Sequence, residues 1–211
     1  MGLSMESMAI AMPAVTGHPN RVGFKGVLTI VDAASDKPPA GARGHRVLLT
    51  RRAAEAAIPS LLGMALDHAP AFDRHDVRRK VGVITRAEIV GREIEVSGFL
   101  YARDFPEIVE EIGKAGKSST FLHQAREDGT PARGAHSLPS VARLDPSTSL
   151  RAGSRGARPS TNLGMSYEIA DAQIQDVRAS VWVLNKVTFT GAAILLREKA
   201  AYRATWIELE Q

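Results

Sequence analysis

The sequence contains no cysteine, so it can form no disulfide, no thiolate zinc site and no cysteine nucleophile. Aromatic residues are scarce, at 5%, and no apolar run approaches the roughly 20 residues that a helix needs to cross a bilayer. Residues 1–15 lack a basic region, so we expect residues 1–20 to be a flexible N-terminus and not a signal peptide. The remaining composition, 44% hydrophobic and 24% charged, is typical of a soluble globular protein without a membrane partner.

The positive charge is concentrated in one segment. Residues 123–161 contain six arginines and three acidic residues, which accounts for +3 of the formal net charge of +4. The rest of the chain is close to neutral, so a basic surface for specific nucleic-acid binding is not expected. The segment is rich in Arg, Ser, Gly and Pro without apolar periodicity, and it cannot bury enough surface to offset its ordering entropy. We interpret it as a disordered insertion in a single domain formed by residues 21–122 and 162–211.

The folded part is dominated by strand patterns. Alternation and β-branched residues predict strands at residues 22–31, 81–89, 92–101, 163–169 and 180–190. Gly191-Ala192-Ala193 is expected to end the last of these, with a short helix at 194–201 and a final strand at 204–209. A helix is predicted at 104–115, capped by Asp104. Strands outnumber helices, which favours a mainly β protein with peripheral helices (α+β) built as an antiparallel barrel.

The candidate active site lies on the strand at 163–169. Side chains alternate along a strand, so Gly164, Ser166 and Glu168 share one face, and the Ser166 hydroxyl is open to a substrate. Serine becomes a nucleophile when an imidazole accepts its proton, and His68 is the candidate base. A strand serine facing water and a structural histidine are the commoner interpretations of such residues taken singly.

A charged cluster offers a metal-binding alternative. It contains carboxylates and imidazoles that could hold a divalent ion and activate water, namely Asp67, His68, Asp73, His75 and Asp76. The cations among them oppose a second cation, namely Arg74, Arg78, Arg79 and Lys80. A solvated charged loop is the preferred interpretation, and no metal or other cofactor is expected.

Taken together, several segments resemble the prohead maturation proteases of tailed bacteriophages, which are relatives of the herpesvirus assemblins. The resemblance rests on an early strand (FKGVLTIVDA), a segment containing a histidine (LLGMALDHAP), a strand beginning Val-Gly-Val-Ile, a serine-bearing strand containing Tyr-Glu, and a late strand (VLNKVTFTGAAIL). It covers most of the chain outside the insertion.

The resemblance implies a closed or partly closed β-barrel of the herpesvirus-protease type. It also implies a serine endopeptidase that cleaves scaffold and capsid-protein extensions inside assembling proheads in the host cytoplasm, and that self-associates. The catalytic residues would be His68 and Ser166, in the family's chain order, with Glu168 as the third.

The sequence departs from the family in two places. The family's serine strand usually reads Ser-Ile-Gly-Tyr, which places its nucleophile at Gly164, about 6.6 Å along the strand from Ser166. The acidic residue that the family often carries in its late strand falls near Lys186. No histidine follows Ser166, so a His-Ser-His triad like that of the assemblins is excluded. These departures leave a second hypothesis open: a catalytically inactive capsid-assembly or scaffold protein with the same fold.

Overall fold

The computed structural model describes residues 8–10, 17–114 and 162–210 of the 211-residue chain. The predicted insertion at 123–161 lies outside the described residues, as does most of the predicted flexible N-terminus.

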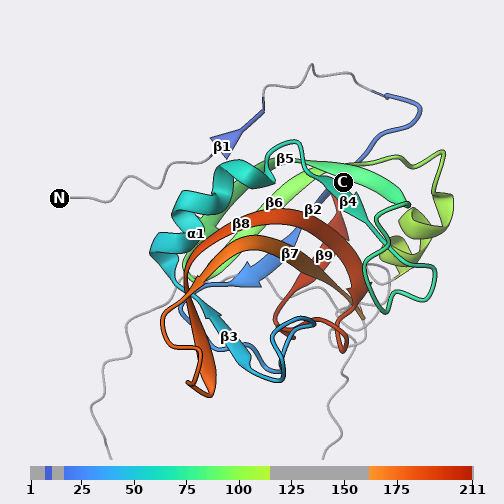
Figure 1. Ribbon diagram of the computed structural model, residues 1–211. Helices are drawn as coiled ribbons and strands as arrows, with labels where there is room; N and C mark the ends of the chain where they lie inside the picture. The colour runs from blue at the N-terminus through green and yellow to red at the C-terminus, as the bar shows by residue number, and fades with distance from the viewer. Residues whose placement is uncertain (1–7, 11–16, 115–161, 211) are drawn as a thin grey trace, which may run out of the picture.

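The described chain forms one curled sheet that is open on one side, a half-barrel (Figure 1). Its strands follow the order β3-β8-β4-β5-β6-β2-β9, with β1 paired to β5 and β7 paired to β8. The strands are β1 (Met8–Ala9), β2 (Val22–Ile30), β3 (Arg46–Leu49), β4 (Ala65–Asp67), β5 (Lys80–Val90), β6 (Glu93–Leu100), β7 (Leu163–Ile174), β8 (Val181–Leu196) and β9 (Trp206–Leu209). The pairs of β8 with β3 and β4 are parallel, and the other named pairs are antiparallel. The expected mainly β architecture is confirmed.

Short helices cover parts of the sheet. Helix α1 (Arg51–Ala57) begins at Thr50, whose hydroxyl accepts a hydrogen bond from the N–H of Ala53, and it continues into the 3-10 helix η1 (Ile58–Leu61). Residues 106–114 form the other helix, close to the predicted range of 104–115. Its Ile108 and Ile112 are buried because they recur on one helical face. None of the helices in the described ranges is long and apolar enough to span a membrane.

The longest strand differs from the prediction. β8 continues through Gly191, Ala192 and Ala193 to Leu196, so the predicted break and the helix at 194–201 are wrong. These small residues are buried because β8 has a neighbour on both sides there, β7 on one edge and β4 on the other. Their local flexibility would favour a turn, but pairing along two edges keeps the backbone extended.

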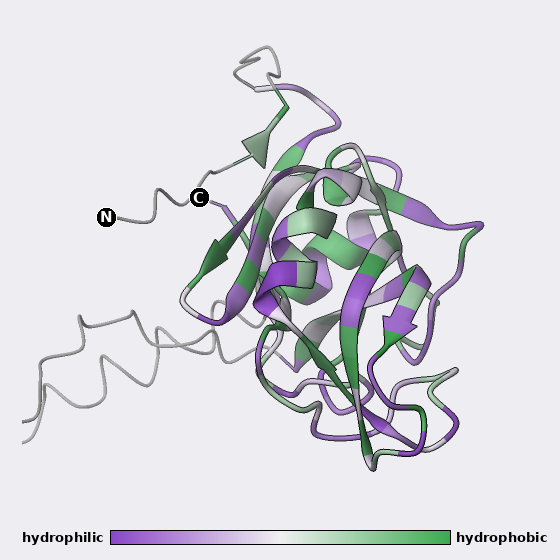
Figure 2. Ribbon diagram, turned by 60° about the vertical axis from the view of Figure 1, so that its left-hand side comes forward, coloured by the Kyte–Doolittle hydropathy of each residue, from purple (hydrophilic) through white to green (hydrophobic). Residues whose placement is uncertain are grey.

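The core lies inside the curl. Figure 2 shows polar and apolar residues alternating along the strands, as expected where one face of a sheet is buried. Met165 and Phe189 are among the largest fully buried side chains, and burial of side chains of this size contributes about 1.5–3 kcal/mol each. Met165 therefore fixes which face of β7 points inward, and the neighbouring Ser166 points to the outer face.

Candidate functional site

Three strands bring Ser166 and Asp67 onto one face of the sheet. Ser166 on β7 pairs with Ala193 on β8, and Ala193 pairs on its other side with Asp67 on β4. Directly paired residues point to the same side of a sheet, and two strand spacings separate the outer members by roughly 10 Å. Ala193 lies between them, and its small side chain leaves space above the sheet. An imidazole in this space could reach both the hydroxyl of Ser166 and the carboxylate of Asp67.

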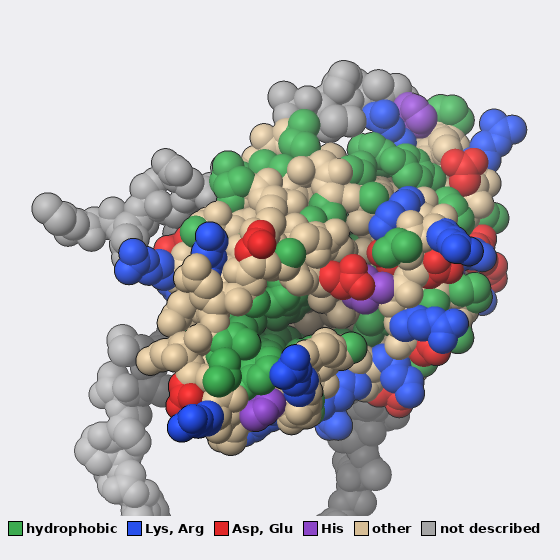
Figure 3. Space-filling view, in the orientation of Figure 1, with side chains coloured by type: hydrophobic (Ala, Val, Ile, Leu, Met, Phe, Trp, Pro, Cys, Tyr) green, Lys and Arg blue, Asp and Glu red, His purple; other side chains and the backbone are tan. Residues whose placement is uncertain are grey.

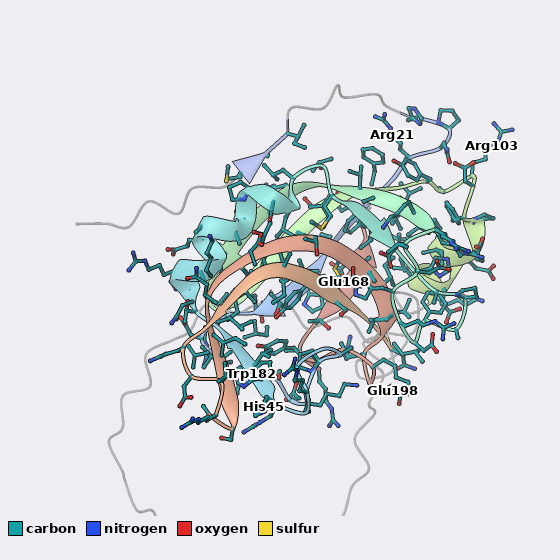
Figure 4. The ribbon with its side chains drawn as sticks, in the orientation of Figure 1. Arg21, His45, Arg103, Glu168, Trp182 and Glu198 are labelled. Atoms are coloured by element: carbon teal, nitrogen blue, oxygen red, sulfur yellow. The ribbon has the colours of Figure 1, made fainter. Side chains whose placement is uncertain are left out.

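His75 is an imidazole that lies beside Asp67 and Glu168. Its Nδ1 lies 3.5 Å from Oδ1 of Asp67 and 3.9 Å from Oε1 of Glu168. The ring is only 15% exposed, and neither ring nitrogen has a hydrogen-bond partner. Figure 4 shows Glu168 on the β7 arch, and Figure 3 shows a histidine against acidic side chains at this place. Nδ1 thus faces two acids, and Nε2 is left without a partner.

The loop that carries His75 folds back onto the sheet through its main chain. It joins β4 to β5, and the N–H of Asp76 donates to Oδ1 of Asp67 at 3.0 Å. The N–H of Leu196 on β8 donates to the carbonyl of Phe72 at 2.7 Å. These bonds attach the loop to β4 and to β8, so His75 is held beside the row formed by Ser166, Ala193 and Asp67.

Asp67 is a buried, ionised carboxylate. Its side chain is 0% exposed, and its Oδ2 accepts a hydrogen bond from Nζ of Lys80 at 3.2 Å. Burial by itself would raise the pKa of Asp67, but the imidazole of His75, the N–H of Asp76 and the ammonium of Lys80 outweigh it and hold that pKa below its usual range. The site therefore contains a fixed negative charge beside Nδ1 of His75.

Glu168 reaches the site because Gly191 has no side chain. A Cβ at Gly191 would stand 2.7 Å from Oε2 of Glu168 and 3.3 Å from its Cβ. The Glu168 side chain is 47% exposed, so its carboxylate is shared between the solvent and the imidazole.

Position 164 is not available for a nucleophile. A Cβ at Gly164 would lie 2.6 Å from Oγ1 of Thr205 and 3.3 Å from Cα of Arg197. The same threonine oxygen accepts the N–H of Met165 at 3.2 Å. The segment at 197–205 thus covers Gly164, whereas Ser166 is partly exposed. Of positions 164 and 166, the second therefore has access to solvent, and it carries the Ser166 hydroxyl.

The expected pairing of His68 with Ser166 is not formed. His68 is 1% exposed, its Nδ1 lies 2.9 Å from the carbonyl of Ala69, and its Nε2 has no hydrogen-bond partner. Its ring packs against Phe72 and Phe105, at centroid distances of 5.3 and 6.4 Å. His68 is therefore a packing residue, which is the commoner interpretation of a single histidine. Neighbouring residues of an extended chain point to opposite sides, so the orientation of Asp67 towards Ser166 turns His68 away.

The charged loop is partly as expected. Asp73, Arg74 and Arg78 are exposed, which agrees with a solvated loop, but Asp67 is fully buried. No group of three potential metal ligands is found among the described residues. Sequence reasoning placed His75 in this loop and assigned it no catalytic role. Because neighbouring residues of a strand face opposite sides, the sequence indicated that only one of Asp67 and His68 could face Ser166. The pairing of β4 with β8 decides that this residue is Asp67.

A comparison of the chain with protein-family models, with curated proteins and with solved structures finds no significant match.

Proposed function

We propose that this protein is a serine endopeptidase in which His75 activates Ser166. The observation that carries the proposal is the position of His75: Nδ1 faces the buried Asp67, Nε2 has no partner, and Asp67 shares a face of the sheet with Ser166. In the reaction, Nε2 accepts the proton of Ser166 as its Oγ attacks the carbonyl carbon of the substrate. His75 then protonates the leaving amine, and a water molecule hydrolyses the acyl-serine ester. Asp67 and Glu168 stabilise the imidazolium that forms.

The free edge of β7 supports a peptide as the substrate. Among the described strands β7 pairs only with β8. In an antiparallel ladder, residues that bond across the pair alternate with residues whose N–H and C=O point away from it. The N–H of Met165 points away, to Thr205, so the N–H and C=O of Tyr167 point to the same free edge. An extended peptide can add as a strand there, beside Ser166. In Figure 3, a hollow with hydrophobic side chains lies below the β7 arch.

The resemblance to prohead maturation proteases supports a more specific proposal, namely that this endopeptidase acts in phage prohead maturation. The substrates are then scaffold and capsid-protein extensions, and the protein acts in the host cytoplasm inside assembling proheads and self-associates. The curled sheet is compatible with a closed or partly closed barrel of the herpesvirus-protease type. Co-expression with candidate capsid and scaffold proteins tests this assignment through the sizes of the products.

Covalent labelling tests the chemistry. A fluorophosphonate probe reacts with activated serine hydroxyls, and peptide mass spectrometry locates the modified residue. We expect one label, at Ser166, which Ser166→Ala abolishes. His75→Ala should slow labelling by at least about 100-fold, as expected for loss of a general base. The matched control His45→Ala removes a ring that stacks on Trp182 and should label normally. Labelling of Ser166 at an unchanged rate in His75→Ala would exclude His75 as the base.

A catalytically inactive capsid-assembly protein is the second candidate. The observation that favours it is that Ser166 has no hydrogen bond to His75 or to His68, since Nε2 of both rings is unpartnered. Hydrogen bonds of catalytic groups are often long before the substrate binds. Absence of both Ser166 labelling and cleavage of unfolded casein in the wild-type protein would favour this candidate.

A further inference from the structure

A β-bulge places Lys80 next to Asp67. Leu66 pairs with Gly82, but the next residue, Asp67, pairs with Lys80, so Val81 is an extra residue on β5. Without the bulge, Asp67 would lie opposite Val81, whose side chain is fully buried in the core. Bulges re-aim side chains and are frequent next to active sites. Here the bulge turns a cation to the face that bears Ser166 and the buried carboxylate.

Because Lys80 contacts one carboxylate oxygen of Asp67, the other oxygen faces the loop that carries His75. Nζ of Lys80 lies 3.2 Å from Oδ2, which leaves Oδ1 directed at the N–H of Asp76 and at Nδ1 of His75. The lysine side chain is 40% exposed and Asp67 is fully buried, so the ammonium reaches the carboxylate from the solvent side. A hydrogen bond to an ionised group is about twice as strong as a neutral one and fixes the orientation of its acceptor.

We propose that Lys80 is a positioning residue of the active site, which orients the Asp67 carboxylate so that Oδ1 holds the N–H of His75 at Nδ1 and leaves Nε2 for Ser166. This inference rests on the proposed function. Lys80 itself does not touch the substrate, and it acts on the chemistry only through Asp67.

The charges around His75 show why one cation matters. The groups that face the ring are Asp67 from β4 and Glu168 from β7, with Lys80 from β5 behind Asp67. Arg74 and Asp76 flank it in the loop, where Arg74 is largely exposed and lies 3.9 Å from Asp73. Lys80 is therefore the cation that contacts the buried acid of the site. Its removal leaves two carboxylates beside the imidazole and takes away the ion pair that orients Asp67.

Lys80→Met and Lys80→Arg test the proposal in the full-length protein, with fluorophosphonate labelling of Ser166 measured between pH 5 and 9. Methionine keeps an apolar stem and removes the charge, and arginine keeps the charge. We expect Lys80→Met to label about ten- to a hundredfold more slowly, because misplacement of a catalytic group costs rates of this order. Lys80→Arg should restore most of the rate. Lys25→Met removes a surface ion pair with Glu208 and is the matched control.

Nitrogen-15 spectra of the imidazole provide a readout that does not depend on labelling. In the wild type we expect neutral His75 to carry its proton on Nδ1, and in Lys80→Met a mixture of both tautomers. Thermal melting shows whether Lys80→Met folds. If it does not, the labelling rate of the double variant Asp67→Asn/Lys80→Met is compared with that of Asp67→Asn. Equal labelling rates support the proposal, because Lys80 then acts only through Asp67. Unchanged labelling and an unchanged tautomer in a folded Lys80→Met overturn it. If the wild type is not labelled, the proposed function fails, while the tautomer still decides the role of Lys80.

Discussion

The carboxylate of Glu168 lies across Gly191, where a Cβ would stand 2.7 Å from its Oε2. The two residues pair directly across β7 and β8, so a side chain at position 191 would occupy the space through which Glu168 approaches His75. The site therefore depends on a residue that carries no functional group.

Gly191→Ala should push Glu168 away from His75 and slow the labelling of Ser166. Because the displaced atom is the end of a flexible side chain, the free energy of unfolding should change by less than about 1 kcal/mol. Glu168→Gln should slow labelling to a similar extent, and the double variant should be no slower than the slower single one. Additive effects would mean that Gly191 does not act through Glu168.

Asp67→Asn should destabilise the protein. It removes the charge that Lys80 and the loop at residue 76 bind, and loss of hydrogen bonds to a buried charged group costs about 2 kcal/mol. Urea denaturation at pH 7 measures the change. Lys25→Met, which removes an exposed ion pair, should cost less than about 1 kcal/mol. Equal losses of free energy of unfolding in the two variants would show that the contacts of Asp67 stabilise the protein no more than an exposed ion pair does.

His68 should make stability depend on pH. Burial lowers the pKa of His68 below its model-peptide value of 6.5, so the unfolded chain binds this proton more readily than the folded protein does. The contribution of neutral His68 to the free energy of unfolding is fully present above pH 6.5. It is lost as the pH falls from 6.5 towards the lowered pKa of His68 in the folded protein. His68→Phe keeps a ring against Phe72 and should remove this component. Urea denaturation of both proteins at pH 7.5 and 5.5 measures the difference, and identical pH dependence would contradict the assignment.

Gly164→Ser should not create a nucleophile. The new side chain would meet Thr205 and the backbone of Arg197, and overpacking of this kind typically costs about 1–3 kcal/mol. The double variant Gly164→Ser/Ser166→Gly should therefore label no faster than Ser166→Ala. Ser166→Ala, at a partly exposed position, should melt like the wild type. Restored labelling in the double variant would show that position 164 has access to the substrate.

The sequence by itself determined most of the strands, the helix at 106–114, and the shared face of Ser166 and Glu168. These features depend on local rules, namely β-branching, period-two alternation and helical periodicity. The same rules failed at Gly191-Ala192-Ala193, because two neighbouring strands hold that segment extended.

Only the tertiary structure decided which histidine meets the serine strand. His68 and His75 both lie between β4 and β5, and nothing in their local sequence distinguishes a ring packed on Phe72 from a ring that faces two acids. The choice follows from the pairing of β4 and β7 with β8, from the bulge at Val81, and from the loop that folds back onto Asp67. These contacts join residues as many as 126 positions apart, and local pattern carries no information on such pairings.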